Sequence, residues 1–383
     1  MKFNVSSKAL QSQLTAVSKV INSKNALSIL DNFLLILQGD TLTITGSDSE
    51  NTMTATAQVF DSEGEGPIAI NAKRLLDVLK EVPAQPITFE INDQTKEVDI
   101  RILNGHFNFM GIDGNEFPLK DDSAEEKQSF TIPASVVRKG LENTLFAVGT
   151  DAIRPIMTGV YWDICPREGE SEALPGITFV ASDTHKLVRY TNTECNPGLT
   201  AGFILPPKPA AILRALIGKE DGDVAIEMDA QSATFTIGEF KLSCRFIKGK
   251  YPNYNRVIPD NNPFELTIDR ISLLTAMRRV SLFANAASSL VRLNIRQGEV
   301  LLGAQDLDYS TSAEERLECD YQGNVMTIGF NAVYMIEVLN NLQSDTVVIR
   351  LSDPARPGIF VPLVQLEGED VLMLLMPMQV MDY

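Results

Sequence analysis

"FNVSSKALQSQLTAVSKVI" (residues 3–21) is the stretch that decides the fold, because its pattern returns twice later in the chain. A short alternating strand runs directly into an amphipathic helix with an apolar stripe on one side. The same arrangement begins again at "FTIPASVVRKGLENTLFAV" (130–148) and at "FELTIDRISLLTAMRRVSLFA" (264–284). Self-similarity over such long intervals predicts a chain built from homologous structural units.

Three further landmarks recur in the same order in each third of the chain. A strand ends in Asp at "TITGSD", "TFVASD" and "LLGAQD", which close on Asp48, Asp183 and Asp306. A second strand–helix–strand unit then follows, at 68–91, 203–228 and 327–351. Each third closes on an aromatic residue or Met followed by Pro, at 117–118, 251–252 and 376–377. Four ordered landmarks repeated three times exclude coincidence.

The repeats predict an α+β fold with three homologous domains, each made of two strand–helix–strand half-units. The length of 383 residues agrees, because single cores stop growing at about 250–300 residues. One helix per half-unit gives six helices in all. The charged and polar connections at 120–129 and 253–263 place the domains at residues 1–120, 129–253 and 262–383.

The composition is that of a globular protein outside membranes. No apolar run approaches the roughly 20 residues that span a bilayer, and the N-terminus lacks the apolar core of a secretory signal. The four cysteines form no C-x-x-C pair, and the chain has two histidines. Neither a metal site nor a nucleotide-binding fingerprint is predicted, so we expect a cytoplasmic protein with no cofactor and no membrane partner.

The distribution of charge changes the meaning of its total. The net charge is −17, which by itself disfavours a nucleic-acid partner. Five of the six predicted helices nevertheless carry net positive charge. A solvated helix face explains any one of them, whereas five together indicate one basic surface able to contact phosphates. The basic helix residues that we expect to face the phosphates are Lys73, Arg74, Arg138, Lys208, Arg214 and Arg278.

With the repeats in place, the sequence resembles the beta subunits of the bacterial DNA polymerase III holoenzyme, the sliding clamps. The resemblance covers essentially the whole chain. It rests on ordered motifs: "MKF-V" at the start, "ILDNFLL" (29–35), "FPLKDD" (117–122), "RPIMTGV" (154–160), "ASDTHKL" (181–187), "KGKYPNYNRVIP" (248–259) and "MPM" (376–378).

The resemblance implies a non-catalytic processivity factor. Two chains would form a head-to-tail ring, with helices lining the hole and sheets outside, that encircles duplex DNA without reading its sequence. Lys24 and Arg154 match places where clamps carry basic residues toward DNA. The ring seams would use Phe107 and Phe109 on an edge strand of the first domain, and Leu282 and Phe283 in the third. A clamp loader would open the ring.

The resemblance also implies a pocket between the second and third domains. Short linear motifs of the replicative polymerase, the clamp loader, and repair and other polymerases would dock there. The pocket residues would be Met157, Thr184, His185, Lys186, Leu187, Pro252, Arg256, Val257, Leu374, Met376, Pro377 and Met378. Thr184 stands where many clamps have Gly, Lys186 where many have Arg, and Gln379 where Arg is common. These departures put the polar rim of the pocket, and hence the preferred motif, in question.

Two other readings of the chain remain open at this point. One is a hydrolase centred on Asp183 and His185, for which the chain offers no G-x-S-x-G nucleophile elbow. Asp183 has counterparts in the other repeats whereas His185 has none, so we expect the Asp to be structural, in a turn or cap. The other is a monomeric three-domain scaffold that binds peptides but not DNA, against which the helix charges count.

Overall fold

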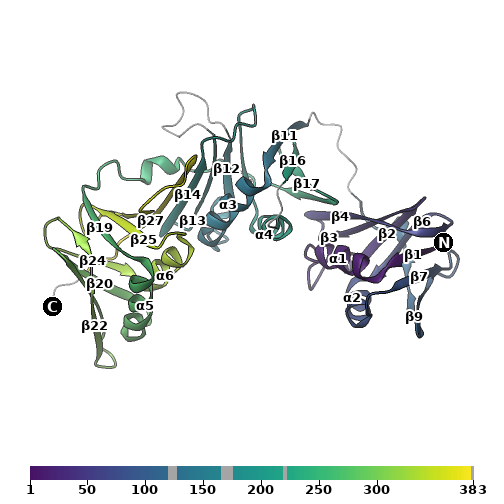
Figure 1. The fold of residues 1–383 in the computed structure, drawn as a ribbon, viewed down its shortest axis with the longest axis horizontal. Helices are drawn as coiled ribbons and strands as arrows, with labels where there is room; N and C mark the ends of the chain where they lie inside the picture. The colour runs from purple at the N-terminus through teal and green to yellow at the C-terminus, as the bar shows by residue number, and fades with distance from the viewer. Residues whose placement is uncertain (120–126, 165–175, 219–221, 381–383) are drawn as a thin grey trace. The chain divides into compact units, whose positions relative to one another are not determined.

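The computed structural model describes residues 1–119, 127–164, 176–218 and 222–380 (Figure 1). These residues form two compact units. The first unit comprises Met1–Ala134 and Ala211–Phe246, and the second comprises Ser135–Ala210 and Ile247–Tyr383. The central third of the chain therefore contributes strands to both units.

The first unit contains two antiparallel sheets. The five-stranded sheet has, in order, β5 (Phe60–Glu63), β1 (Lys2–Ser6), β7 (Pro86–Ile91), β8 (Glu97–Ile102) and β9 (Gly105–Met110). The nine-stranded sheet has β10 (Ile112–Asp113), β6 (Gly66–Asn71), β2 (Asn32–Gln38), β3 (Thr41–Ser47), β4 (Asn51–Gln58), β18 (Phe240–Arg245), β17 (Ser232–Ile237), β16 (Asp223–Met228) and β11 (Gln128–Pro133).

The second unit also contains two antiparallel sheets. Its nine-stranded sheet has β15 (Ala201–Leu205), β12 (Val160–Ile164), β13 (Ile177–Ser182), β14 (Lys186–Asn192), β27 (Glu369–Leu375), β26 (Gly358–Pro362), β25 (Thr346–Leu351), β19 (Phe264–Asp269) and β23 (Asp320–Tyr321). Its four-stranded sheet has β22 (Thr311–Glu318), β21 (Glu299–Asp306), β20 (Leu290–Arg296) and β24 (Met326–Asn331).

Six α-helices occur within the described residues, one for each predicted half-unit. They are α1 (Ser7–Val17), α2 (Ala72–Glu81), α3 (Ala134–Thr144), α4 (Pro207–Leu216), α5 (Arg270–Val280) and α6 (Ala332–Asn341). The predicted α+β fold and its repeat are confirmed: β1–α1, β11–α3 and β19–α5 follow one pattern, and β6–α2–β7, β15–α4–β16 and β24–α6–β25 follow the other. None of the described helices is long and apolar enough to cross a membrane.

Local sequence explains where the helices begin. The side chain of Asn71 accepts a hydrogen bond from the backbone N–H of Arg74, and Asn331 accepts one from that of Val333. Each such N-cap contributes about 1 kcal/mol by satisfying an amide that the helix leaves without a partner. Helix α4 begins at Pro207, where the missing N–H and fixed φ of Pro suit the first turn.

Strands differ in how far they are buried: β13 and β26 of the second unit are buried along their whole length. Strands such as β4 and β16 alternate between buried and more exposed residues, as expected for a sheet with one face on a core. Helices α1 and α2 pack together in the first unit, and α5 and α6 pack together in the second. The fully buried Trp162 of β12 packs against Phe179 and Phe203 in the second unit.

Candidate functional site

The Asp that ends a strand in each third closes a tight turn. Asp48, Asp183 and Asp306 each accept hydrogen bonds through Oδ1 from the backbone N–H groups two and three residues further on, at 2.7–3.4 Å. The prediction that this shared Asp is structural is confirmed. The turn of the second domain brings Thr184 to a φ of 80°, a left-handed conformation that favours Gly.

His185 does not form a catalytic pair with Asp183. Its ring stacks on that of Tyr334 in α6, with centroids 5.3 Å apart and planes 14° from parallel. One carboxylate oxygen of Asp183 is held by the turn amides, and the other accepts a hydrogen bond from Nζ of Lys186 at 2.5 Å. A triad requires an acid that orients the imidazole, and Asp183 is committed elsewhere. The geometry therefore removes the support for the hydrolase hypothesis.

Lys186 is the buried cation of this site. Its side chain is 4% exposed, and Nζ lies 2.5 Å from Asp183 and 2.9 Å from Glu337 of α6. The ammonium also lies 4.6 Å from the centre of the Tyr334 ring. Burial alone would lower the pKa of Lys186, but the hydrogen bonds and charges of Asp183 and Glu337 outweigh it and raise the pKa. Lys186 is therefore charged, and its ammonium links Asp183 of the turn to Glu337 of α6.

An apolar cluster lies next to this turn. Leu187 and Leu374 are buried in it, and the half-buried Met157 packs against it, so three predicted pocket residues meet here. Antiparallel pairing of β14 with β27 sets Leu187 directly opposite Leu374. The cluster comprises Val180, Leu187, Ile204, Tyr251, Tyr254, Val348, Ile359, Val361, Leu372 and Leu374.

The remaining predicted pocket residues lie outside the cluster itself. The backbone N–H of Met376 donates to the carbonyl of His185 at 2.8 Å, which joins the end of β27 to the turn. Met376 is 42% exposed and Val257 is 53% exposed, although apolar side chains usually avoid water. Pro252 and Arg256 are exposed on the segment whose Tyr251 and Tyr254 enter the cluster. Pro377 and Met378 are half-buried and line a separate hollow with Thr327 and Asp353.

A cavity of about 370 Å³ opens beside the turn. Its walls include Met157, Thr184, His185 and Lys186 from the predicted pocket, with Tyr334 and Glu337 of α6 opposite. Arg154, predicted to face DNA, also lines this cavity and forms an ion pair with Asp151 at 3.3 Å. One cavity is therefore lined by the turn, by α6 and by the segment that precedes β12. Met157 belongs both to its wall and to the side chains packed on the apolar cluster.

Sequence reasoning missed several residues of this site. Ile359 and Val361 belong to the cluster because β26 pairs with β27, with Ile359 opposite Leu374. Tyr334 and Glu337 come from α6 and contact the turn across 149 and 151 positions of sequence, respectively. The helix pattern of α6 was readable, but nothing in it indicates which face meets the turn. Tyr251 and Tyr254 lie in the motif at 248–259, and their spacing of three residues is the signal that could have identified them.

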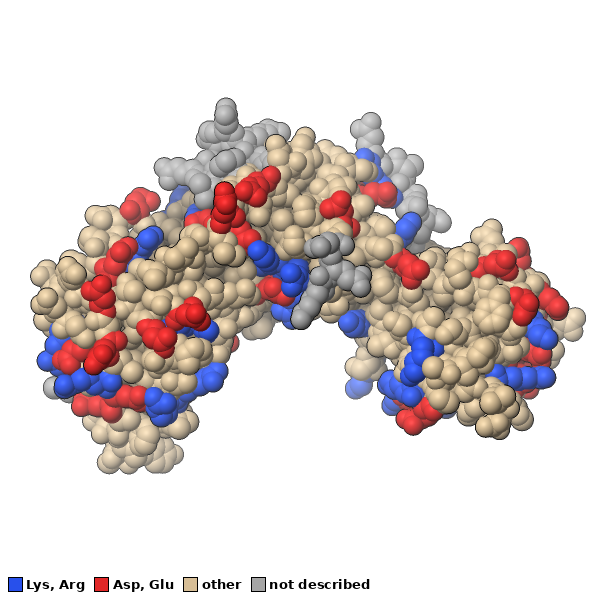
Figure 2. All heavy atoms as spheres, in the orientation of Figure 1, with Lys and Arg blue, Asp and Glu red and all other residues tan. Residues whose placement is uncertain are grey.

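Most of the predicted basic residues are accessible. Lys24, Lys73, Arg74, Arg214 and Arg278 are exposed. Arg138 and Lys208 are half-buried, and Arg138 lies 4.0 Å from Glu142 one helical turn away. Figure 2 shows Lys and Arg side chains gathered over α1 and α2 in the first unit, on the lower side of the view. In the second unit they are mixed with acidic side chains over α5 and α6.

The four predicted seam residues lie at sheet and helix ends. Phe107 and Phe109 are half-buried on β9, an outermost strand of its sheet, opposite Ile100 and Val98 of β8. Leu282 is 80% exposed and Phe283 41% exposed in the 3-10 turn that follows α5. An exposed Leu–Phe pair and an open sheet edge are both features that proteins usually cover.

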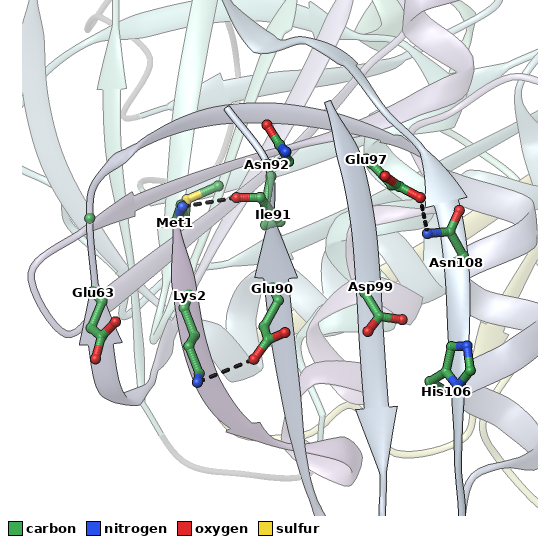
Figure 3. A pocket seen from close by; sticks show the side chains of 11 residues that line it. Met1, Lys2, Glu63, Glu90, Ile91, Asn92, Glu97, Asp99, His106 and Asn108 are labelled. Atoms are coloured by element: carbon green, nitrogen blue, oxygen red, sulfur yellow. Dashed lines mark hydrogen bonds and ion pairs between the residues drawn. The ribbon is translucent and has the colours of Figure 1, made fainter. Parts of the chain in front are cut away.

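A further hollow, of about 700 Å³, lies on the five-stranded sheet and contains none of the predicted residues (Figure 3). Several of the charged side chains in and beside its wall are paired with one another. Glu90 lies 3.2 Å from Lys2 and 2.7 Å from Arg101, and Arg101 also bonds Asp99. Within the described residues, no group of three or more His, Cys, Asp or Glu side chains could hold a metal ion.

Comparison with known proteins finds relatives that align with almost the whole chain. The sequence is 25% identical over 380 residues to the beta sliding clamp of Pseudomonas aeruginosa, and 27% identical over 383 residues to that of Treponema pallidum. Each alignment covers 99% of this chain and 100% of the relative. The structure matches the sliding clamp of Bartonella birtlesii bound to griselimycin with a TM-score of 0.91 at 27% identity, and that of Caulobacter crescentus with a TM-score of 0.89 at 26% identity. Both structural matches cover 99% of this chain and 100% of the other.

The family models agree in order and position along the chain. The N-terminal domain of the DNA polymerase III beta subunit matches residues 1–121, its central domain residues 131–253 and its C-terminal domain residues 255–379. Three consecutive matches of this kind, on a chain whose folded repeats follow the same order, leave one assignment: the chain belongs to the DNA polymerase III beta subunit family, the bacterial beta sliding clamps.

Proposed function

We propose that this chain acts as a DNA sliding clamp, a non-catalytic processivity factor that encircles duplex DNA as a homodimeric ring. The proposal rests on two edge strands whose counterparts in the other repeats are paired with each other. Strands β4, β14 and β22 follow the Asp turn of their thirds, and β9, β18 and β27 are the last long strands of theirs. Strand β4 pairs with β18, and β14 pairs with β27.

Among the residues that the structure describes, the third equivalent pairing is not made. Strands β22 and β9 are the corresponding pair, and each is the outermost strand of its sheet. If β22 of one chain pairs with β9 of a second chain, and the reverse, two copies give six similar junctions and a closed ring. Such a dimer has two equivalent interfaces, as two-fold symmetry requires. Leu282 and Phe283 follow α5, which packs on β22, so their exposed side chains lie where the second copy would dock.

The charge pattern suits a ring that holds DNA loosely. Helix residues Lys73, Arg74, Arg138, Lys208, Arg214 and Arg278, with Lys24 and Arg154 in loops, would face the duplex. Phosphate contacts of this kind carry no sequence information and weaken with salt. The net charge of −17 would keep the rest of the surface from binding nucleic acid nonspecifically. Retention would therefore come from topology, with sliding permitted.

The apolar cluster and its borders would bind partner motifs. Leu187, Leu374 and Met157 would supply the floor, and Met376, Met378, Val257 and Pro252 flexible apolar walls. Met side chains repack around different ligands, as a surface shared by several polymerases and a clamp loader requires. Thr184, His185 and Arg256 would contact the polar end of a peptide. Lys186, whose ammonium is bonded to Asp183 and Glu337, would act by holding the turn.

The domain limits follow the repeat in this proposal, at residues 1–120, 129–253 and 262–383. The linker residues 120–126 and the terminal residues 381–383 lie outside the described part of the chain. A clamp of the bacterial replication machinery would work in the cytoplasm, where the DNA is, and would need no cofactor. A clamp loader would be required to open the ring.

The seam gives the first test. Changing Leu282→Ala together with Phe283→Ala should convert the dimer into monomers at micromolar concentration, because two exposed apolar anchors of each interface are lost. Sedimentation velocity measures the change. Ile153→Ala removes a side chain that is 88% exposed elsewhere in the same unit, and that variant should remain a dimer. A double variant that sediments as the wild type would mean that the seam lies on another surface.

A further inference from the structure

The hairpin that ends the third domain differs from its counterparts. Strands β8 and β9 are joined by Leu103–Asn104, and β17 and β18 by Gly238–Glu239. The equivalent strands β26 and β27 are joined by residues 363–368, "LVQLEG", which we name the apolar loop. The repeat shows that a short turn suffices to connect these strands, so the additional residues serve something other than the connection.

Three aliphatic side chains of the apolar loop face solvent. Leu363 is 55% exposed, Val364 74% and Leu366 63%. Single exposed aliphatic residues are ordinary on protein surfaces, whereas three within four positions form a patch of the kind that marks interaction sites.

The apolar loop is held rigidly, so the patch is a preformed surface. The Gln365 side chain donates to the carbonyl of Val371 at 2.9 Å and accepts from its N–H at 3.0 Å. Backbone bonds add to this: Leu363 donates to Thr346, and Thr193 donates to Gly368 at 2.8 Å. A preformed surface loses little conformational entropy when a partner docks, which favours binding.

The charges around the apolar loop are negative. The Glu194 carboxylate lies against Gly368, since a Cβ built there would stand 2.6 Å from its carboxyl carbon. Glu367 is exposed within the loop. The two carboxylates that follow the loop are paired with cations, Glu369 with Lys139 and Asp370 with Arg189 at 2.7 Å. An apolar patch with acidic neighbours is complementary to an amphipathic segment that carries Lys or Arg beside its apolar residues.

From these observations we propose that the apolar loop is a second docking surface, which binds a basic amphipathic helix of a partner protein. It is separate from the candidate site at His185. Strand β27 connects the two, with the apolar loop before Glu369 and Met376 after Leu375, which sets them roughly 25 Å apart. A partner could therefore use this surface while the candidate site is occupied. The proposal does not depend on the ring or on DNA.

The test uses the full chain and a fluorescent Leu/Lys amphipathic helical peptide about five turns long as the probe. We expect saturable binding in fluorescence anisotropy, weakened about tenfold or more by Val364→Ser with Leu366→Ser. Leu103→Ser, at the equivalent hairpin and 86% exposed, is the matched control and should bind as the wild type does. Glu194→Gln with Glu367→Gln should also weaken binding, and a Leu/Glu peptide with the same apolar spacing should not bind.

Two results would overturn the proposal. One is equal binding of the probe to the wild type and to the Val364→Ser, Leu366→Ser variant, since the peptide would then be held by the acidic surface in general. The other is displacement of the probe by an unlabelled Gln-Leu-x-Leu-Phe peptide, which would place it at the candidate site. Because these variants change exposed side chains, the fluorescence of the buried Trp162 should be unchanged, and this confirms that each variant is folded.

Discussion

Lys186→Met is expected to lower the free energy of unfolding of the second unit by about 2–3 kcal/mol. Met has a similar length and no charge, so the change leaves the carboxylates of Asp183 and Glu337 without their shared cation. Removing one partner of a fully buried ion pair costs about 3–5 kcal/mol. The lower value applies here because Glu337 is 41% exposed and water compensates part of its charge.

Denaturation followed by tryptophan fluorescence measures this effect, because the chain has one tryptophan and Trp162 is buried in the second unit. Lys186→Arg keeps the charge and should cost less than the Met variant. Arg350→Met breaks the exposed pair with Glu265 in the same unit and should cost below about 1 kcal/mol. Equal stability of Lys186→Met and the wild type would show that the cluster does not hold the turn to α6.

The same cluster predicts a pH dependence. The pKa of Lys186 is raised in the folded chain above its ordinary value of 10.5, so the folded state favours the proton. The stabilisation is therefore fully present below the unfolded pKa and is lost as the pH rises through the folded one. The difference in the free energy of unfolding between the wild type and Lys186→Met should therefore shrink as the pH rises beyond 10.5.

Removal of residues 376–383 is expected to abolish binding of a fluorescent Gln-Leu-x-Leu-Phe peptide. The intact chain should bind it with a Kd of roughly 1 μM, or about −8 kcal/mol. The truncation removes Met376, Pro377 and Met378, together with the hydrogen bond from Met376 to His185, while β27 ends before it at Leu375. Fluorescence anisotropy reports the loss directly.

A chain that ends at Val380 is the matched control, because it keeps the Met-Pro-Met segment. It should bind the peptide as the intact chain does. If the chain cut before Met376 binds equally well, the Met-Pro-Met segment takes no part in the partner site. If neither the intact chain nor the control binds, the motif preference differs from that of the probe, as Thr184, Lys186 and Gln379 would allow, or partners do not dock here.

The repeat made much of the fold predictable. Short-range patterns can be read from the sequence. Strands alternate between apolar and polar residues, Asn71 and Asn331 stand just before helices, and a turn follows each of the three repeated Asp residues. These features depend on neighbours a few positions away, so sequence contains what is needed to read them. The structural role of Asp183 followed from its counterparts at Asp48 and Asp306.

The site was less predictable because its contacts are long-range. Ile359 and Val361 join the cluster through the pairing of β26 with β27. The sequence of neither strand predicts which strand it pairs with. The sequence places Lys186 on the turn, but its burial depends on Glu337 of α6. Arg154 stands in a motif that suggests a DNA contact, and its position in the cavity beside His185 depends in addition on how the segment before β12 folds back.

The central claim is that this protein is retained on DNA by encircling it, and topology tests that claim most directly. The protein is loaded by its clamp loader onto nicked circular DNA, separated from free protein by gel filtration in moderate salt, and the DNA is then cut once. The account predicts stable retention on the circle and rapid loss from the linear product. Lys24→Glu with Lys208→Glu and Arg214→Glu should lower loading or retention while the dimer persists. Equal retention before and after the cut would contradict the ring.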